Sequence, residues 1–206
     1  IDISYDSITK AKQKITEANI HNVQFCQADI FDLPFAGNRF DHIFVCFVLE
    51  HLSDPIQVLK ILKNHLKPGG SITVIEGDHG STYFYPESEY AQKAIDALVE
   101  LQKIGGGNAL IGRSLYPLMQ EAGFDSVSVS PRMVYVDASR PELIDGFTKK
   151  TFNAMIEGVR ESVIQSGIID QTTFEQGIQD LYRTTEKDGV FCYTFFKAIA
   201  RKKKVD

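Results

Sequence analysis

The sequence predicts an α/β protein built on a parallel β-sheet with helices on its faces. Up to residue 76 the segments follow the order strand, helix, strand, strand, helix, strand, which is typical of such a sheet. The strand expected over Phe40–Val48 is almost wholly apolar, as in a central strand covered on both faces. Glu50 and His51 follow this strand directly. Because ligands of open α/β sheets bind beyond the carboxyl ends of the strands, we expect a binding site there.

Composition restricts the class of protein further. The 206 residues are 43% hydrophobic and 24% charged, which predicts one domain with a subdomain and a sizeable core. The net charge of −5 argues against binding nucleic acid through its phosphates. No apolar run approaches the roughly 20 residues of a membrane-spanning helix. The three cysteines lack metal-ligand spacing, so we expect free thiols, no metal and a cytoplasmic protein.

Two short strands are expected near the N-terminus. The chain opens on Ile1-Asp2-Ile3-Ser4, which reads as the end of a strand whose beginning is missing, so we expect an N-terminally truncated chain. After a helix capped by Ser4, residues Val23–Ile30 form the next expected strand, closed by Asp29. A turn at Leu33-Pro34-Phe35 then leads to the apolar strand.

The middle of the chain repeats the alternation. Asp54-Pro55 is a strong helix start, with a capping aspartate and proline at the first helical position, and Pro68-Gly69-Gly70 ends that helix. A strand over Ser71–Glu76 and a loop over Gly77–Pro86 are expected to follow.

The C-terminal half predicts a helical excursion before the last strand. The expected elements are helices over 87–104 and 114–122, a strand over 127–136, a long helical region from 139, and a strand over 190–200. Pro131 places the strand over 127–136 near a sheet edge. We therefore expect a core over 1–138, a helical insertion or lid over 139–188, and the last core strand with a basic tail over 189–206.

Four ordered pieces resemble the class I S-adenosylmethionine-dependent methyltransferases, close to the ubiquinone/menaquinone-biosynthesis branch. The pieces are Ile1–Ser4, Ala28–Ile30 with Leu33–Phe35, Phe40-Asp41 leading to Val48–Leu52, and Leu66–Gly70. The resemblance covers nearly the whole chain. It implies a Rossmann-like, mostly parallel sheet with an antiparallel last strand, and S-adenosyl-L-methionine as the cofactor.

The resemblance also implies residues that bind adenosine. Asp2 matches the acidic residue that accepts hydrogen bonds from both ribose hydroxyls, a task that suits a carboxylate because it offers only acceptors. Asp29 matches the acceptor for the adenine amino group, with the Ile30 backbone and the Ile3 side chain beside the ring. The alternatives are a helix N-terminal Asp2, a loop-capping Asp29 and a core role for Ile3.

Cys46 and Phe47 match the strand end that runs along the methionine part of the cofactor, where an aromatic face suits a cationic sulfonium. Buried packing explains Cys46 better than covalent chemistry, because no basic residue neighbours it in sequence. Cys46–Leu49 also stand where amino-methylating DNA enzymes carry an Asn/Asp-Pro-Pro-Tyr/Phe motif, which disfavours a nucleic-acid substrate.

One family feature is absent from these 206 residues. The glycine-rich loop, with the pattern Glu/Asp-x-Gly-x-Gly-x-Gly, should precede Ile1, and Gly105-Gly106-Gly107 does not replace it because it follows a helix. That loop lets the backbone approach the cofactor. We expect the chain alone to bind the cofactor poorly, and a longer protein that carries the loop to bind it.

The acceptor side offers four candidate residues. His79 and His51 are candidate acid–base residues, although a structural role is favoured for His51 and a solvent-facing loop position is equally compatible with His79. Glu76 and Arg113 are candidates for substrate binding, and Arg113 could equally pair with a structural carboxylate.

The function expected from the resemblance is methyl transfer to a small-molecule acceptor by in-line displacement. The alternatives are a non-catalytic binding protein with the same fold and a nucleotide-dependent oxidoreductase on a similar sheet. We expect neither nucleic acid nor membrane as a partner, and leave a homodimer open.

Overall fold

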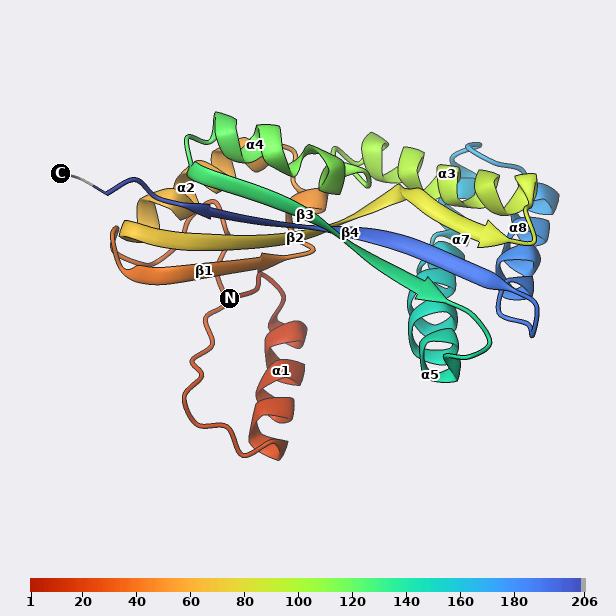
Figure 1. Ribbon diagram of the computed structural model, residues 1–206, viewed down its shortest axis with the longest axis horizontal. Helices are drawn as coiled ribbons and strands as arrows, with labels where there is room; N and C mark the ends of the chain where they lie inside the picture. The colour runs from red at the N-terminus through yellow and green to blue at the C-terminus, as the bar shows by residue number, and fades with distance from the viewer. Residues whose placement is uncertain (205–206) are drawn as a thin grey trace.

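A four-stranded sheet in the order β1-β2-β4-β3 lies at the centre of the computed structural model, which describes residues 1–204 (Figure 1). The strands are β1 (Phe40–Cys46), β2 (Leu66–Tyr85), β3 (Asp125–Val136) and β4 (Val190–Arg201). β1 pairs in parallel with β2, whereas β4 is antiparallel to both β2 and β3. Three strands therefore share one direction and the last opposes them, which confirms the predicted sheet.

Helices flank the two ends of this long sheet. They are α1 (Tyr5–Glu17), η1 (Leu49–His51), α2 (Pro55–His65), α3 (Glu89–Ile104), η2 (Ile111–Ser114), α4 (Leu115–Glu121), α5 (Pro141–Leu143), η3 (Ile144–Asn153), α6 (Ala154–Gly158), α7 (Arg160–Gln165) and α8 (Gln171–Arg183). Figure 1 shows α2 and α4 at one end of the sheet, α3 and α5–α8 at the other, and α1 standing apart below it. Within the described residues, no helix is long and apolar enough to cross a membrane.

Local sequence signals fix several of these elements. The Asp54 side chain caps α2 by accepting from the Gln57 N–H at 2.9 Å, and Pro55 occupies the first helical turn, as predicted. Ser4 caps α1 in the same way through the Ser7 N–H. β3, which contains Pro131, pairs with β4 alone and is an edge strand, also as predicted.

The two N-terminal strands that the sequence predicts, Ile1–Ser4 and Val23–Ile30, do not form. A single parallel bridge between Asp2 and Gln27 joins these segments, and neither pairs with β1. An isolated pair of segments is at best marginally stable, because it lacks the neighbouring strands that would bury its apolar side chains. Ile3 is accordingly 69% exposed.

β1 also differs from the buried central strand expected over 40–48. It ends at Cys46 and forms the sheet edge in the described part of the chain, with the Phe44 side chain 60% exposed. The apolar composition identified the strand correctly but could not show how many neighbours it has.

The prediction of a loop over Gly77–Pro86 is wrong, because β2 continues to Tyr85. Asp78 pairs with Thr194 and Tyr83 with Cys192, so residues 79–82 bulge out opposite Tyr193 alone. Hydroxyl groups satisfy the bulged backbone: Ser81 Oγ donates to the Asp78 carbonyl at 2.7 Å and Thr82 Oγ1 to that of His79 at 2.8 Å. The Gly- and Ser-rich residues thus mark a β-bulge rather than the end of the strand.

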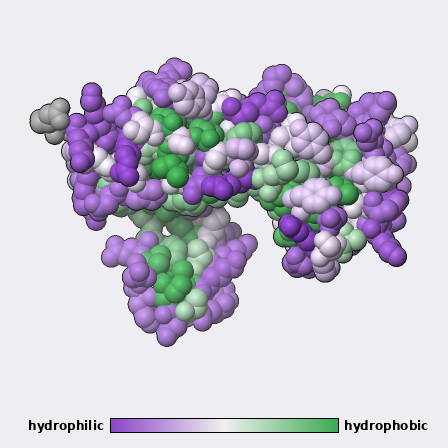
Figure 2. All heavy atoms as spheres, viewed as in Figure 1, coloured by the Kyte–Doolittle hydropathy of each residue, from purple (hydrophilic) through white to green (hydrophobic). Residues whose placement is uncertain are grey.

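The buried apolar residues form two cores. The first packs β1 and the start of β2 against α2 and α4, and includes Leu59, Ile72 and Met119. The second packs the end of β2 and the start of β4 against α3, η3 and α6–α8, and includes Phe152 and Phe174. In Figure 2 the residues around α1 form a separate lobe below the sheet, with apolar surface exposed on it.

Candidate functional site

The bridge between Asp2 and Gln27 brings two predicted cofactor residues onto neighbouring segments. Asp2 Oδ1 accepts from the Ser4 N–H at 2.7 Å, and Asp29 Oδ1 accepts from the Phe31 N–H at 2.9 Å. Both residues are exposed, with Ile30 half-buried beside Asp29. Each carboxylate therefore uses one oxygen in a local hydrogen bond, on a residue that remains exposed. Their role in binding adenosine stays a prediction.

Phe47 lies directly past the end of β1 in a left-handed conformation, with φ +54°. Its backbone N–H donates to the Ile75 carbonyl at 3.0 Å, which continues the parallel pairing with β2, and its ring lies 5.3 Å from that of Phe195. The Phe47 side chain remains 44% exposed. An accessible aromatic face thus lies at the carboxyl end of β1.

The Cys46 thiol is not poised for covalent chemistry. Its partial burial raises its pKa, and the neighbouring carboxyl groups of Glu76 and Glu50 raise the pKa further. A reactive cysteine needs an electropositive environment that stabilises the thiolate. The structure therefore favours a packing role for Cys46.

Glu76 lies on β2 beside the carboxyl end of β1 and is fully buried. Its Oε1 accepts from the N–H groups of Val48 and Leu49 at 3.1 and 2.9 Å, whereas Oε2 has no hydrogen-bond partner in the described residues. Burial raises the pKa of Glu76 to about 7, and the nearby Glu50 contributes in the same direction. Burial therefore favours the protonated form of this carboxyl over the ionised form.

Asp78 and Arg113 form a two-pronged ion pair beside the bulge. Arg113 Nε donates to Asp78 Oδ2 at 2.7 Å and Nη2 to Oδ1 at 2.8 Å. Asp78 is 1% exposed, and the pairing raises the pKa of Arg113. Arg113 thus pairs with a structural carboxylate, the second of its two expected roles. Half of its side chain still faces solvent, so contact with an acceptor is a separate prediction.

His79 is not a solvent-facing loop residue, because it is only 6% exposed. Its ring Nδ1 lies 2.6 Å from the Tyr193 hydroxyl, and its backbone N–H donates to the Ala109 carbonyl at 3.0 Å. Burial lowers the pKa of His79 to about 4 and raises that of Tyr193. Both groups are therefore uncharged at neutral pH and act as a hydrogen-bonded pair.

His51 belongs to η1 and points to solvent, with 64% of its side chain exposed. Its Nε2 lies 3.3 Å from Glu50 Oε1, and burial raises the pKa of Glu50. Its expected roles, structural or acid–base, remain predictions.

Tyr193, which the sequence did not indicate as a site residue, joins an aromatic cluster between the bulge and η3. We define the aromatic cluster as Phe147, Phe152, Phe191, Tyr193 and Phe195. Ring centroids within it lie 4.7–6.2 Å apart, and Phe152 meets His79 edge-on at 6.1 Å. The run Phe191–Phe196, rich in aromatic residues, was the available signal, but strand periodicity alone did not show which rings face His79.

Two polar side chains on the π-helix η3 were also missed. Thr148 and Asn153 are both fully buried, and Thr148 Oγ1 and both amide atoms of Asn153 have no hydrogen-bond partner in the described residues. π-Helical turns occur frequently at functional sites. Thr148 and Asn153 therefore join the candidate residues on the acceptor side.

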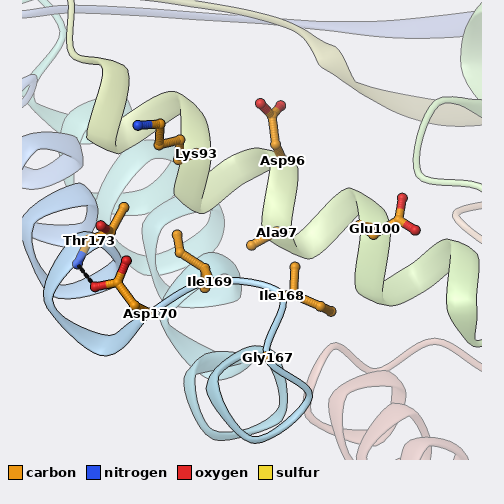
Figure 3. A pocket seen from close by; sticks show the side chains of 9 residues that line it. All are labelled: Lys93, Asp96, Ala97, Glu100, Gly167, Ile168, Ile169, Asp170 and Thr173. Atoms are coloured by element: carbon orange, nitrogen blue, oxygen red, sulfur yellow. Dashed lines mark hydrogen bonds between the residues drawn. The ribbon is translucent and has the colours of Figure 1, made fainter.

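A hollow of about 550 Å³ lies elsewhere, between α3 and the loop that leads into α8 (Figure 3). Its lining includes Lys93, Asp96 and Asp170, whose carboxylate caps α8 by accepting from the Thr173 N–H at 2.9 Å. None of the predicted site residues lines it.

Comparison with known proteins places these residues in a family context. Residues 1–123 match the family described as "Methyltransferase domain". A demethylmenaquinone methyltransferase of Listeria monocytogenes is 36% identical over 76 residues, which are 37% of this chain and 32% of the relative. The chain thus spans about a third of the length of that relative.

Solved structures extend the similarity to nearly the whole chain. A phosphoethanolamine N-methyltransferase 2 of Haemonchus contortus, in complex with S-adenosyl-L-methionine, matches with a TM-score of 0.57 at 16% identity, covering 98% of this chain and 42% of the other. The cyclase SpnF matches with a TM-score of 0.54 at 16% identity, covering 98% and 64%. At such identities the similarity concerns the fold alone.

Proposed function

Because the chain belongs to the methyltransferase-domain family, we propose that it moves a methyl group from S-adenosyl-L-methionine to a small-molecule acceptor. The observation that supports this best is the bridge between Asp2 and Gln27. It lies within the residues that match the family, and it sets the carboxylates of Asp2 and Asp29 on adjacent parallel segments. Two acidic acceptors in this arrangement suit the donors of an adenosine.

The residues present fit the cofactor in part. Asp2 would accept from the ribose hydroxyls and Asp29 from the adenine amino group, each through the oxygen that is free of local hydrogen bonds. The exposed ring of Phe47 would contact the sulfonium region beside Cys46. The cofactor, when bound, supplies an electrophilic methyl group. The glycine-rich loop of the family is not among the 206 residues, so binding by this chain alone would be weak.

The protein's own part in the reaction would be to orient the acceptor and exclude water. The aromatic cluster supports the proposal that the acceptor is small and partly apolar. Such an acceptor would lie between the bulge of β2 and the helical region over 139–188. That helical region would act as a lid. The His79–Tyr193 pair would position a polar group of the acceptor by hydrogen bonding. A base is needed only for an acceptor that arrives protonated. His79, with its pKa lowered to about 4, would then be a weak one.

The test is methyl transfer from radiolabelled cofactor to a fractionated small-molecule extract. We expect label in a small organic product, and loss of that label in the double variant Asp2→Asn, Asp29→Asn. A matched control is Asp6→Asn, an exposed aspartate in the first turn of α1. Absence of label from every fraction, or unchanged labelling by the double variant, would contradict the proposal.

A non-catalytic binding protein is the second candidate. The same fold occurs in the cyclase SpnF, and a fold by itself does not fix an activity. Calorimetry combined with the labelling assay separates the two candidates, because a binding protein would take up the cofactor without producing labelled product from any fraction.

A further inference from the structure

Glu76 holds one carboxylate oxygen in place and leaves the other free. The two N–H groups that bind Oε1 belong to Val48 and Leu49, which directly follow Phe47 at the end of β1. Oε2 is buried and has no hydrogen-bond partner within residues 1–204. Buried polar atoms are almost always paired in native proteins, so an orphaned oxygen in a fixed carboxyl group needs an explanation.

The groups around Glu76 supply no positive charge to it. Cys46 faces it from β1, Glu50 from η1 and Tyr193 from β4, and each is neutral or acidic. Among its neighbours on β2, Asp78 is already neutralised by Arg113.

The remaining neighbour on β2, His79, is an uncharged partner of Tyr193. His51, the nearest residue that can become cationic on η1, pairs with Glu50 and points to solvent. The protein therefore buries an acid beside a second acid and provides no counter-ion in the described residues.

Resting on the function proposed above, we propose that Glu76 binds a cationic group of the ligand through Oε2, and passes from protonated to ionised as that ligand binds. The O–H bond of the carboxyl breaks and its proton goes to solvent. A charge-assisted contact between the carboxylate and the cation takes its place. Burial favours the neutral acid without a ligand, and a cation within contact distance reverses that preference.

The position of Glu76 suits such a group. Phe47, the neighbour of the two residues that hold Oε1, presents an exposed ring at the same strand end, and aromatic faces attract cations. Two parts of the proposed cofactor carry positive charge, the sulfonium and the α-ammonium group. S-adenosylhomocysteine keeps the ammonium group and lacks the sulfonium, so a comparison of the two molecules identifies the source.

The experiment is isothermal titration calorimetry of the chain at pH 6.5, in two buffers with different ionisation enthalpies. Each probe, S-adenosyl-L-methionine or S-adenosylhomocysteine, is titrated into the wild type, Glu76→Gln and the control Glu100→Gln. The amide oxygen in the Glu76→Gln variant would still accept from the two N–H groups, but the amide could not release a proton. Glu100 is a partly exposed acid on α3, paired with Lys103.

We expect the wild type and the control to release a large part of one proton per S-adenosyl-L-methionine bound, and Glu76→Gln to release none. As the pH increases toward 7, the affinity of the wild type should rise by up to about tenfold per pH unit. Above pH 7 the affinity should level off. Release with S-adenosyl-L-methionine alone would assign the sulfonium, and release with both probes would assign the ammonium group.

Binding of both probes without proton release would overturn the role of Glu76 and leave the proposed cofactor intact. Failure of both probes to bind, even at protein and ligand concentrations high enough to detect a weak site, would overturn the proposed function of this chain, and the role of Glu76 with it. If Glu76→Gln fails to fold, proton release by the wild type decides the matter, with its midpoint followed by repeating the titration from pH 5.5 to 8.

Discussion

His79 Nδ1 and the Tyr193 hydroxyl lie 2.6 Å apart inside the protein, although 114 positions separate the two residues in sequence. The bulge over residues 79–82 makes this contact, because it places four residues of β2 opposite Tyr193 alone. A regular strand would pair this stretch residue by residue with β4. The bulge therefore re-aims His79 into the protein, toward the aromatic cluster.

Tyr193→Phe tests what this pair contributes to stability. Removal of the hydroxyl leaves a buried imidazole nitrogen unpaired, so we expect a loss of about 1–3 kcal/mol in the free energy of unfolding. Urea denaturation at pH 7.5 measures it. Tyr135→Phe is the control, because Tyr135 is 45% exposed on the edge strand β3. An equal effect of the two substitutions would contradict a special role for the pair.

The pKa of His79 predicts sensitivity to acid. Its pKa is lowered to about 4 in the folded state, so the unfolded chain binds the proton more readily. Stability from this group is therefore full above about pH 6.5 and is lost progressively as the pH falls toward 4. His79→Asn should show a smaller loss of unfolding free energy between pH 7 and 5 than the wild type. Parallel pH profiles for the two proteins would disprove this.

Glu76 makes the free energy of unfolding depend on pH in the opposite direction. Its pKa is raised to about 7 in the folded state, so its contribution is complete below about pH 4.5 and is lost as the pH rises through 7. Glu76→Gln should gain stability over the wild type as the pH increases from 5 to 8, by at most about 3 kcal/mol at about 1.4 kcal/mol per pH unit. Denaturant titrations across that range measure the difference. A constant difference would show that Glu76 does not titrate there.

The ion pair of Asp78 and Arg113 predicts coupling between the two residues. Arg113→Ala leaves Asp78 buried, with the Gly80 N–H as a remaining donor to its Oδ1. Because Arg113 is half exposed and solvent screens the pair, we expect a loss of roughly 1–3 kcal/mol. The double variant Asp78→Ala, Arg113→Ala should lose less than the sum of the single variants. Additive effects would show that the pair contributes no coupling energy.

Local chemistry explains which parts of the fold the sequence could predict. Asp54-Pro55 and Pro131 act through their own backbone and neighbouring residues, so the start of α2 and the edge position of β3 are correct. The prediction of an N-terminal strand over Val23–Ile30 is wrong because a strand needs neighbouring strands to pair with. The local sequence does not show whether such neighbours are present.

The residues of the candidate site also divide into those that the sequence predicted and those that it did not. Arg113 lies in a short helical turn before α4, as expected, whereas Glu76 and His79 lie within β2 and not past the end of a strand. Tyr193 was missed because its contact with His79 depends on the register between β2 and β4. That register shifts at the bulge, and the Gly- and Ser-rich residues there resemble a loop in sequence.

Asn153 provides the last prediction, which sets stability against binding. Its amide group is fully buried on η3 with neither the oxygen nor the nitrogen paired in the described residues. An unpaired buried polar group costs about 1–3 kcal/mol, and its replacement by an apolar group of similar shape removes that cost. Asn153→Leu should therefore unfold at higher urea concentration than the wild type. If the amide serves the acceptor, the same substitution should weaken methyl transfer.

Thr148→Val is the matched second variant, since it replaces the other unpaired side chain of η3 with a group of nearly the same shape. Both variants should be at least as stable as the wild type and less active, a combination that a purely structural role would not produce. A less stable Asn153→Leu would show that the amide is paired in solution, with buried water as its partner. Full activity in both variants would instead place the acceptor away from η3, and the aromatic cluster would then need a different explanation.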